Sequence, residues 1–237
     1  MGLRAALERS ASSRPADVVR RLRFRGSGRY WEQRYARGGT SGAGSSGAAA
    51  RWKASVVNRW VADLGVTSVV DLGCGDGNQL ALAAYPRYLG IDRSPTAVRR
   101  CIARFRGDPT KSFLRYEPGQ LVDPAGWLRG DLALSMEVIF HLVEDEVFED
   151  YMRLLFASAE RYVAVCSNDA AHGDAAPHLR YREFTAWVAQ NQPEWELLRR
   201  EDPPPGLDLV SSCWLYGRAG QARAGVLPGR DGVEGSA

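Results

Sequence analysis

The sequence predicts an α/β fold in which a mostly parallel, doubly wound sheet is covered by helices. Short apolar runs alternate with segments whose apolar residues recur at helical spacing, from Ser68 onward. A glycine-rich stretch, GCGDG, directly follows the first of these runs. Such alternation is typical of sheets whose parallel strands are connected by helices.

Length and composition bound the class of protein. The 237 residues are enough for one domain with a sizeable core, and 45% hydrophobic with 25% charged residues is an ordinary globular balance. The net charge of +3 argues against a polyelectrolyte binder. Because no apolar run approaches the roughly 18 residues of a membrane span, we expect no membrane partner.

The cysteines predict a reducing environment. Cys74, Cys101, Cys166 and Cys213 lack CxxC spacing, which argues against a zinc site and against a secreted disulfide framework. We therefore expect reduced thiols and a cytoplasmic location. No cluster of metal ligands is evident, so no metal is predicted.

Two segments precede the main domain. Residues 1–37 form a basic arm with ten arginines against three acidic residues, expected to be solvated and partly helical. A transit peptide, or contact with nucleic acid or an anionic substrate, are the alternatives. Within the arm, RYWEQRY looks structured. Residues 38–50 are Gly/Ser-rich and are either a flexible linker or a loop that folds over a ligand as a lid.

The domain proper is expected over residues 51–217. It opens with a helix whose apolar face starts at Trp52 and which Gly65 stops. Strands are predicted at 68–72, 88–92, 113–116, 131–135, 162–166, 195–198 and 212–216. Further helices are predicted at 79–84, 95–105, 144–159 and 184–191. Residues 218–237 are Gly/Ala/Arg-rich and are expected to form a disordered tail.

The glycine loop indicates a nucleoside site. Parallel sheets bind ligands at the carboxyl ends of their strands, and glycines let a ligand approach bare backbone. Gly73, Gly75 and Gly77 read G-x-G-x-G, whereas a dinucleotide fingerprint is G-x-G-x-x-G and a P-loop needs a following lysine. Asp71 lies just before the loop, where a carboxylate suits a cationic amine and opposes a pyrophosphate.

A second carboxylate identifies the ligand class. The strand YLGID ends at Asp92, where a carboxylate can accept hydrogen bonds from both ribose hydroxyls. The site therefore calls for an adenosine-like ribose, a cation near Asp71 and no pyrophosphate. S-adenosylmethionine meets all three requirements.

At this point the chain resembles a known family. VVDLGCGDG followed by YLGID is similar to motifs one and two of class I S-adenosylmethionine-dependent methyltransferases. The resemblance implies a Rossmann-like sheet of seven strands with the last one antiparallel. It also implies that Cys74, frequent at this place in the family, is not a nucleophile. The cofactor-binding residues predicted in this way are Asp71, Gly73, Cys74, Gly75, Asn78, Asp92, Arg93 and Ser135.

A finer resemblance is to a group of bacterial small-molecule methyltransferases. Its members read roughly YWExRY and GGxSGxGSxG before motif one, DVIYHLVED after the fourth strand, and HxRHRxF later. The matching stretches here are YWEQRYARGGTSGAGSSG, EVIFHLVED and HLRYREF, with Lys53 and Asn58 also in place. Ser46, Tyr181 and the shortened EDPPPG segment depart from the pattern, which bears on substrate identity.

Two residues after the fourth strand are candidates for the acceptor side. An acceptor hydroxyl or ammonium must lose a proton, so a nearby base helps. His141 is predicted to be a base or a substrate anchor, and Glu137 to accept the proton or hold the substrate. The structural alternatives are a histidine satisfied by neighbouring backbone and a glutamate that binds loop N–H groups.

Four further residues are predicted to bind substrate. His178, Arg180 and Arg182 alternate, which in an extended loop places them on one face and suits an anionic or hydroxyl-rich molecule. Lys53 is the fourth. In the alternative interpretation, the arginines pair with the acidic run at residues 144–150.

The sequence thus favours O-methylation of a small polar acceptor, such as a sugar or natural-product intermediate, with S-adenosylmethionine as the cofactor. The fourth strand is followed by SMEV where nucleic-acid N-methyltransferases usually carry a D/N-P-P-Y/F stretch, so nucleic acid is disfavoured as a partner. An N-methyltransferase of small amines or RNA, and a non-catalytic cofactor-binding partner subunit, are the alternatives. A homodimer stays open.

Overall fold

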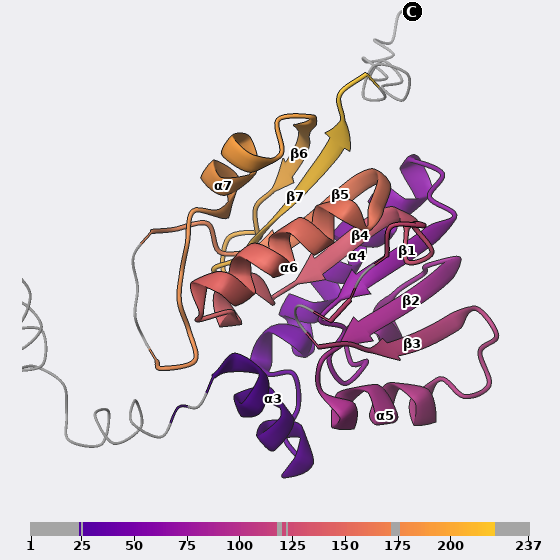
Figure 1. Cartoon of the computed structure of the whole chain (residues 1–237), viewed down its shortest axis with the longest axis vertical. Helices are drawn as coiled ribbons and strands as arrows, with labels where there is room; N and C mark the ends of the chain where they lie inside the picture. The colour runs from indigo at the N-terminus through magenta and orange to yellow at the C-terminus, as the bar shows by residue number, and fades with distance from the viewer. Residues whose placement is uncertain (1–23, 25, 118–119, 122, 172–175, 221–237) are drawn as a thin grey trace, which may run out of the picture.

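The computed structural model describes residues 24, 26–117, 120–121, 123–171 and 176–220. Its centre is a seven-stranded sheet in the order β3-β2-β1-β4-β5-β7-β6. The pairs from β3 to β5 are parallel, whereas β7 runs antiparallel to both β5 and β6. The predicted doubly wound sheet with an antiparallel last strand is confirmed (Figure 1).

The elements lie close to the predicted ranges. The strands are β1 Ser68–Leu72, β2 Arg87–Asp92, β3 Lys111–Arg115, β4 Gly130–Met136, β5 Ala159–Ser167, β6 Trp195–Glu201 and β7 Ser212–Arg218. The helices are α3 Ser27–Ala36, α4 Gly47–Asp63, α5 Pro95–Arg104, α6 Asp145–Ala157 and α7 Phe184–Asn191. Three 3₁₀ turns complete the described elements: η1 Ala43–Ser45, η2 Leu80–Leu82 and η3 Ile139–His141.

One predicted helix is wrong. Residues 79–84 form only the turn η2, and Ala83 is already extended. The side chain of Asn58 on α4 accounts for this, because it donates to Leu82 O (3.0 Å) and accepts from Ala84 N–H (2.9 Å). These bonds satisfy groups that a longer helix would have used, and Pro86 disfavours helix in the residue before it.

The two faces of the sheet are buried by different helices. Alternate side chains of a strand point to opposite faces, so Val69 of β1 packs in the core under α4, whereas Val70 packs in the core under α6 and α7. Trp60 of α4 and Phe156 of α6 are among the largest fully buried side chains of these two cores. Figure 1 shows α6 and α7 lying over one face of the sheet. This layering leaves the carboxyl ends of β1, β2 and β4 open to a ligand.

The expectation of four reduced thiols is wrong. Cys166 and Cys213 form a disulfide, while Cys74 and Cys101 are free and buried. The two bonded cysteines are 47 residues apart in sequence but face each other directly across β5 and β7, with Cα atoms 4.1 Å apart. Only strand pairing brings them together, so spacing in the sequence could not show it. Because disulfides persist mainly in oxidising environments, the cytoplasmic location stays a prediction.

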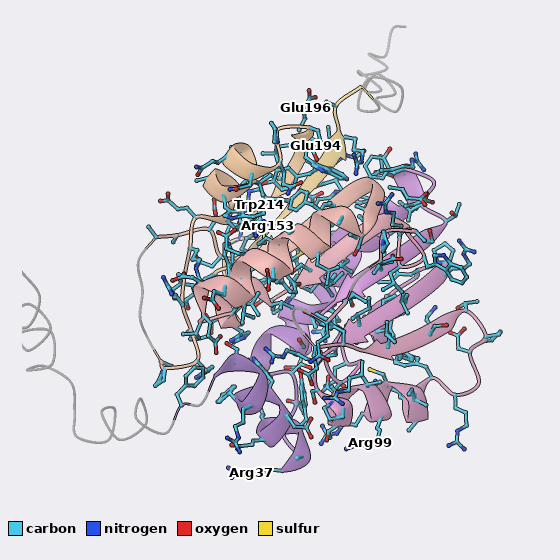
Figure 2. The ribbon with its side chains drawn as sticks, in the orientation of Figure 1. Arg37, Arg99, Arg153, Glu194, Glu196 and Trp214 are labelled. Carbon is cyan, nitrogen blue, oxygen red and sulfur yellow. A yellow bond between two sulfur atoms is a disulfide. The ribbon has the colours of Figure 1, made fainter. Side chains whose placement is uncertain are left out.

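The basic arm ends in a helix that belongs to the domain. Glu32 of α3 accepts hydrogen bonds from Ser94 Oγ, Thr96 N–H and Thr96 Oγ1 at the start of α5. At the other end of α3, the Arg100 guanidinium donates to Tyr35 O and Gly39 O. Figure 2 labels Arg37 and Arg99 at this end of the molecule.

The rest of the arm, residues 1–23 and 25, and the predicted tail from residue 221 lie outside the described residues. In the part of the chain that the structure describes, no helix is both long enough and apolar enough to cross a membrane.

Candidate active site

A pocket lies at the carboxyl edge of β1, β2 and β4, under a roof made by α3 and the segment before α4. Its lining joins Asp71, Gly73 and Asp92 on one side to Glu137 and His141 on the other. The empty space, counted out to the open solvent at its mouth, is about 830 Å³.

Asp71 lines this pocket and has one unsatisfied carboxylate oxygen. Its Oδ2 accepts from the Tyr88 hydroxyl at 2.7 Å, but its buried Oδ1 has no hydrogen-bond partner among the described residues. Burial is the main cause that raises the pKa of Asp71 to about 7, and the nearby charge of Asp92 adds to it. A buried, unpaired carboxylate oxygen is costly unless a donor or a cation meets it, so Asp71 fits the predicted amine.

The glycine loop is bare because neither conformation nor space allows side chains. Gly73 and Gly75 have φ of 81° and 61°, in the left-handed region that glycine tolerates. A Cβ on Gly73 would lie 2.6 Å from the Val138 side chain, and one on Gly75 would strike the Ser41 hydroxyl. The loop therefore offers backbone atoms alone to a ligand.

Asp92 connects the glycine loop to the start of α5. Its Oδ2 accepts from Gly75 N–H at 2.9 Å and its Oδ1 from Ser94 N–H at 2.8 Å. Burial raises the pKa of Asp92, and these two backbone hydrogen bonds oppose the rise. Each carboxylate oxygen can accept a second hydrogen bond, which leaves capacity for ribose hydroxyls.

The other predicted cofactor residues divide into two groups. Cys74 and Arg93 line the pocket, whereas Asn78 and Ser135 do not. Asn78 donates to the Asp76 carboxylate and accepts from Arg104, and buried Ser135 bonds the Tyr151 hydroxyl at 2.7 Å. A hydrogen bond with Cys101, together with burial, raises the pKa of the Cys74 thiol, so this cysteine stays protonated.

The Gly/Ser-rich segment is fastened across the glycine loop. Ser41 donates from its N–H (3.0 Å) and Oγ (2.8 Å) to the Asp76 carboxylate, and Asp76 N–H donates back to Ser41 Oγ. The Tyr35 hydroxyl lies 3.0 Å from the same Oγ. This arrangement supports a loop that covers a ligand. Residues 47–50, which the sequence places in the loop, form the first turn of α4.

His141 is a half-buried, neutral imidazole at the wall of the pocket. Burial lowers its pKa to about 4. Its Nδ1 lies 3.3 Å from His178 O, and the edge of the Trp31 ring packs against it with centroids 4.7 Å apart. We assign the proton to Nδ1, because only then can Nδ1 donate to that carbonyl. Nε2 is then the nitrogen able to accept a proton.

Glu137 has an unusual backbone. Its φ of 58° is the one positive value among the described residues other than glycine, a conformation that costs about 1–2 kcal/mol for an L-residue. Glu137 N–H donates to Cys166 O at 2.8 Å, which holds the turn after β4. Strain of this kind concentrates at functional sites, and here it aims a carboxylate into the pocket.

None of the four predicted substrate-binding residues lines the pocket itself. Lys53 is fully buried, with Nζ 3.3 Å from Glu137 Oε1. Arg182 donates to Leu142 O and Val143 O, and Arg180 also donates to Val143 O. Both arginines pair with Asp145, as in the alternative interpretation. His178 stacks on the ring of Tyr30, with centroids 4.4 Å apart.

Sequence reasoning missed the aromatic roof. Trp31 and Tyr35 of α3 line the pocket, as does Tyr116 just after β3. The density of aromatic residues in RYWEQRY was the available signal, because exposed arms rarely carry so many. No pattern in the sequence shows that this helix lies over the glycine loop. In the described residues, no group of three His, Cys, Asp or Glu side chains could hold a metal ion.

Comparison with known proteins agrees with this geometry. Residues 70–163, from β1 to β5, match the family model described as a methyltransferase domain. This is the class I methyltransferase fold. The resemblance to class I S-adenosylmethionine-dependent methyltransferases is therefore confirmed. No curated protein matches the sequence.

Solved structures share the fold at low sequence identity. The N-methyltransferase NodS from Bradyrhizobium japonicum WM9, solved with S-adenosyl-L-homocysteine, is 13% identical with a TM-score of 0.59, over 82% of this chain and 99% of that one. Magnesium protoporphyrin IX methyltransferase (ChlM) from Synechocystis PCC 6803, solved with bound SAM, is 16% identical with a TM-score of 0.56, over 88% and 99%. The [4+2]-cyclase SpnF is 19% identical with a TM-score of 0.56, over 74% and 73%. The predicted cofactor is thus one that this fold binds.

Proposed function

We propose that the protein binds S-adenosylmethionine and transfers its methyl group to the hydroxyl of a small polar acceptor, such as a sugar or natural-product intermediate. One observation carries the proposal: a single pocket is lined both by Asp71, Gly73 and Asp92 and by Glu137 and His141. The first group suits a nucleoside with a cationic amine. The second offers proton acceptors on the far side of the same space.

The roles on the cofactor side follow from the contacts. Asp71 Oδ1, buried and unpaired, meets the cationic amine of the cofactor. The bare backbone at Gly73 and Gly75 accommodates its nucleoside, and Asp92 accepts from the ribose hydroxyls. When bound, S-adenosylmethionine supplies an activated methyl group.

On the acceptor side, His141 and Glu137 handle the proton. A neutral imidazole with its proton on Nδ1 can take a hydroxyl proton at Nε2. The pKa of about 4 makes His141 a weak base in the empty pocket. A sulfonium bound nearby would depress this pKa further, and its loss on methyl transfer would remove only that extra depression.

The closed roof supports a small acceptor. Trp31, Tyr35 and Ser41 cover the pocket from α3 and the segment before α4, and the contact between Ser41 and Asp76 keeps this cover in place. A polynucleotide strand would need this cover displaced. A covered pocket of this kind holds its ligands in fixed positions, and positioning is the main contribution that an enzyme makes to an in-line displacement.

N-methylation of a small amine is the second candidate. Glu137 carries the one carboxylate on the His141 side of the pocket lining, and a carboxylate can hold an ammonium as well as a hydroxyl. The same fold also serves a cyclase, and fold alone does not establish a reaction.

Calorimetric titration of the purified chain with S-adenosylmethionine is the first test. We expect micromolar affinity, and a loss of about 100-fold in Asp92→Ala, because two charge-assisted hydrogen bonds to the ribose disappear. Asp63→Ala, which removes an exposed partner of Arg199 on α4, should bind like the original chain.

Radiolabelled methyl transfer to panels of hydroxyl and amine compounds then separates the candidates. Product from hydroxyl compounds supports the proposal, and product from amines alone supports the second candidate. Absence of binding would overturn both. Tight binding with no product from either panel would favour the non-catalytic partner subunit.

A further inference from the structure

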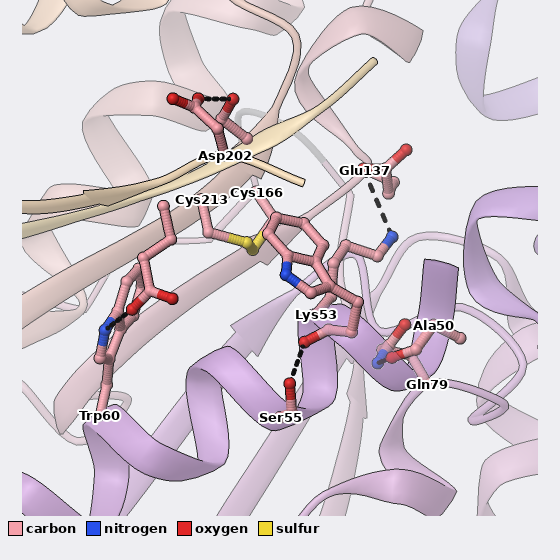
Figure 3. Close-up of a disulfide and its surroundings, with 12 residues drawn as sticks. Ala50, Lys53, Ser55, Trp60, Gln79, Glu137, Cys166, Asp202 and Cys213 are labelled. Carbon is pink, nitrogen blue, oxygen red and sulfur yellow. Dashed lines mark hydrogen bonds and ion pairs between the residues drawn. A yellow bond between two sulfur atoms is a disulfide. The ribbon is translucent and has the colours of Figure 1, made fainter. Parts of the chain in front are cut away.

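A buried ion pair stands behind the acceptor side of the pocket. Lys53 of α4 is fully buried, and its Nζ lies 3.3 Å from Oε1 of Glu137 (Figure 3). Neither atom has a hydrogen-bond partner among the described residues. A buried lysine without a full set of acceptors is costly, so this pair needs an explanation beyond packing.

The two partners relate differently to the pocket. Glu137 lines it, with its side chain 12% exposed, whereas Lys53 does not line it and its side chain is 0% exposed. An acceptor can therefore touch the carboxylate but not the ammonium. Any influence of Lys53 on an acceptor must pass through Glu137.

Several contacts hold the carboxylate in one place. The backbone of Glu137 is in the left-handed region, and its N–H donates to Cys166 O. A Cβ on Gly44, in the roof segment, would lie 2.9 Å from Glu137 Oε2. The carboxylate thus sits between Lys53 below and the roof above, with little freedom to move.

The other cations near this end of the sheet are committed elsewhere. Arg180 and Arg182 bind Asp145 and the carbonyls after η3. Arg93 pairs with Glu117 and packs where a Cβ on Gly28 would stand. Lys53 is therefore the counter-ion that the described structure gives Glu137. Desolvation lowers the pKa of Lys53, while the charge of Glu137 raises it.

We propose that Glu137 is the group that meets the acceptor's proton-donating atom at the methyl-transfer position, and that Lys53 is its positioning residue. Lys53 holds the carboxylate turned toward the place of the methyl group. This inference rests on the proposed function, since it assumes that S-adenosylmethionine occupies the pocket. It assigns the acceptor to the class of molecules that present an ammonium or a hydroxyl there, and it excludes a carboxylate or phosphate at that point.

The proposal can be tested without knowing the acceptor. In sinefungin, the sulfonium and its methyl group are replaced by a carbon that bears a primary amine. The amine therefore occupies the place of the transferred methyl, whereas S-adenosyl-L-homocysteine has nothing there. The ratio of the two dissociation constants, measured by calorimetry at pH 7.5, reports on the group that faces the methyl position.

For the full chain, we expect sinefungin to bind about tenfold more tightly than S-adenosyl-L-homocysteine, through a charge-assisted contact with Glu137. Glu137→Gln should reduce this preference to about twofold or less, with the affinity for S-adenosyl-L-homocysteine unchanged. Lys53→Met should also reduce it, and Lys53→Arg, which keeps the charge, should restore it.

A control variant and a comparison of the two ligands separate this positioning role from a structural one. Glu149→Gln removes a half-buried carboxylate of α6 that accepts from Trp187 Nε1 and does not line the pocket, and it should leave the ratio unchanged. If Lys53→Met weakens both ligands equally, Lys53 serves only the fold and the positioning role is overturned.

The remaining outcomes also test the roles proposed for Glu137 and for the pocket. If the sinefungin preference persists in Glu137→Gln, or is missing from the original chain while S-adenosyl-L-homocysteine binds, Glu137 does not face the methyl position. If neither ligand binds the original chain, the proposed function itself fails.

Discussion

The two sides of the pocket are built in contrasting ways. The proposed cofactor side comes from one continuous stretch, Asp71 to Ser94, and uses glycine backbone and two short carboxylates. The acceptor side is assembled from α3, α4 and the turn after β4, which are distant in sequence. The first is set by local geometry at the ends of adjacent strands. The second exists only after the sheet has brought its parts together.

Charge is also handled in opposite ways on the two sides. Asp71 and Asp92 are buried with only neutral donors within hydrogen-bonding distance. Each therefore has unused hydrogen-bonding capacity that a ligand can fill. Glu137 already has Lys53 as a counter-ion. The cofactor side thus depends on its ligand for electrostatic balance, whereas the acceptor side is balanced in advance.

Loss of the disulfide is expected to have the largest effect, and to fall on stability alone. Cys166–Cys213 closes a loop of 47 residues, for which the chain-entropy relation gives about 4 kcal/mol. Cys166→Ala/Cys213→Ala should lose about this much in urea unfolding. Binding of S-adenosyl-L-homocysteine at β1 and β2 should change less than about twofold.

A reductant provides the matched control, since it should destabilise the original chain and leave the double variant unaffected. Detection of four free thiols in the unreduced, unfolded protein would contradict the bond. A large loss of cofactor affinity in the double variant would show that the two sides of the pocket are coupled.

The second-largest effect concerns Asp71, whose protonation should make ligand binding on the cofactor side depend on pH. Its pKa of about 7 in the empty site means that a cationic amine must drive off a proton below that pH. Affinity for S-adenosyl-L-homocysteine should therefore fall up to about tenfold per unit as the pH drops below 7. Calorimetry between pH 5.5 and 8 measures this, and Asp71→Asn should bind weakly with a flat profile.

The same shift has a consequence for the cofactor-free protein. Because the folded pKa of Asp71 lies above its unfolded value, its contribution to stability is present at low pH and is lost as the pH rises through about 7. Urea unfolding of the cofactor-free chain should show this trend relative to Asp71→Asn. In the binding experiment, an affinity for S-adenosyl-L-homocysteine that does not change between pH 5.5 and 8 would mean that Asp71 does not meet the amine.

The roof should give the smallest effect. Ser41→Ala removes the Oγ contacts to Asp76 and Tyr35, worth about 1 kcal/mol in net hydrogen bonding. Dissociation of S-adenosyl-L-homocysteine should become about fivefold faster, as followed by stopped-flow tryptophan fluorescence. Ser46→Ala, which removes an exposed hydroxyl from the same segment, is the control. Equal rates for the two variants would mean that the segment does not hold the ligand in.

Sequence patterns predicted the elements where local chemistry decides. Ser94 caps α5 with Pro95 in its first turn, and Gly65, with φ of 58°, follows the end of α4. The pattern failed at residues 79–84, because the side chain of Asn58 from another element competed for the backbone. It also failed for Cys166 and Cys213, which only the pairing of β5 with β7 makes neighbours.

The sequence by itself determined the fold class and which residues are proposed to bind the cofactor, because glycines and carboxylates at strand ends act within a few residues of one another. Only the tertiary structure decided the acceptor side. There Lys53, predicted to bind substrate, became the counter-ion of Glu137, and α3 became the roof. Lys53 and Glu137 are 84 residues apart in sequence, and Trp31 and His141 are 110 apart, so no local propensity encodes which buried charge will face which. Burial decides it, because a fully buried ammonium left without a counter-ion is strongly destabilising.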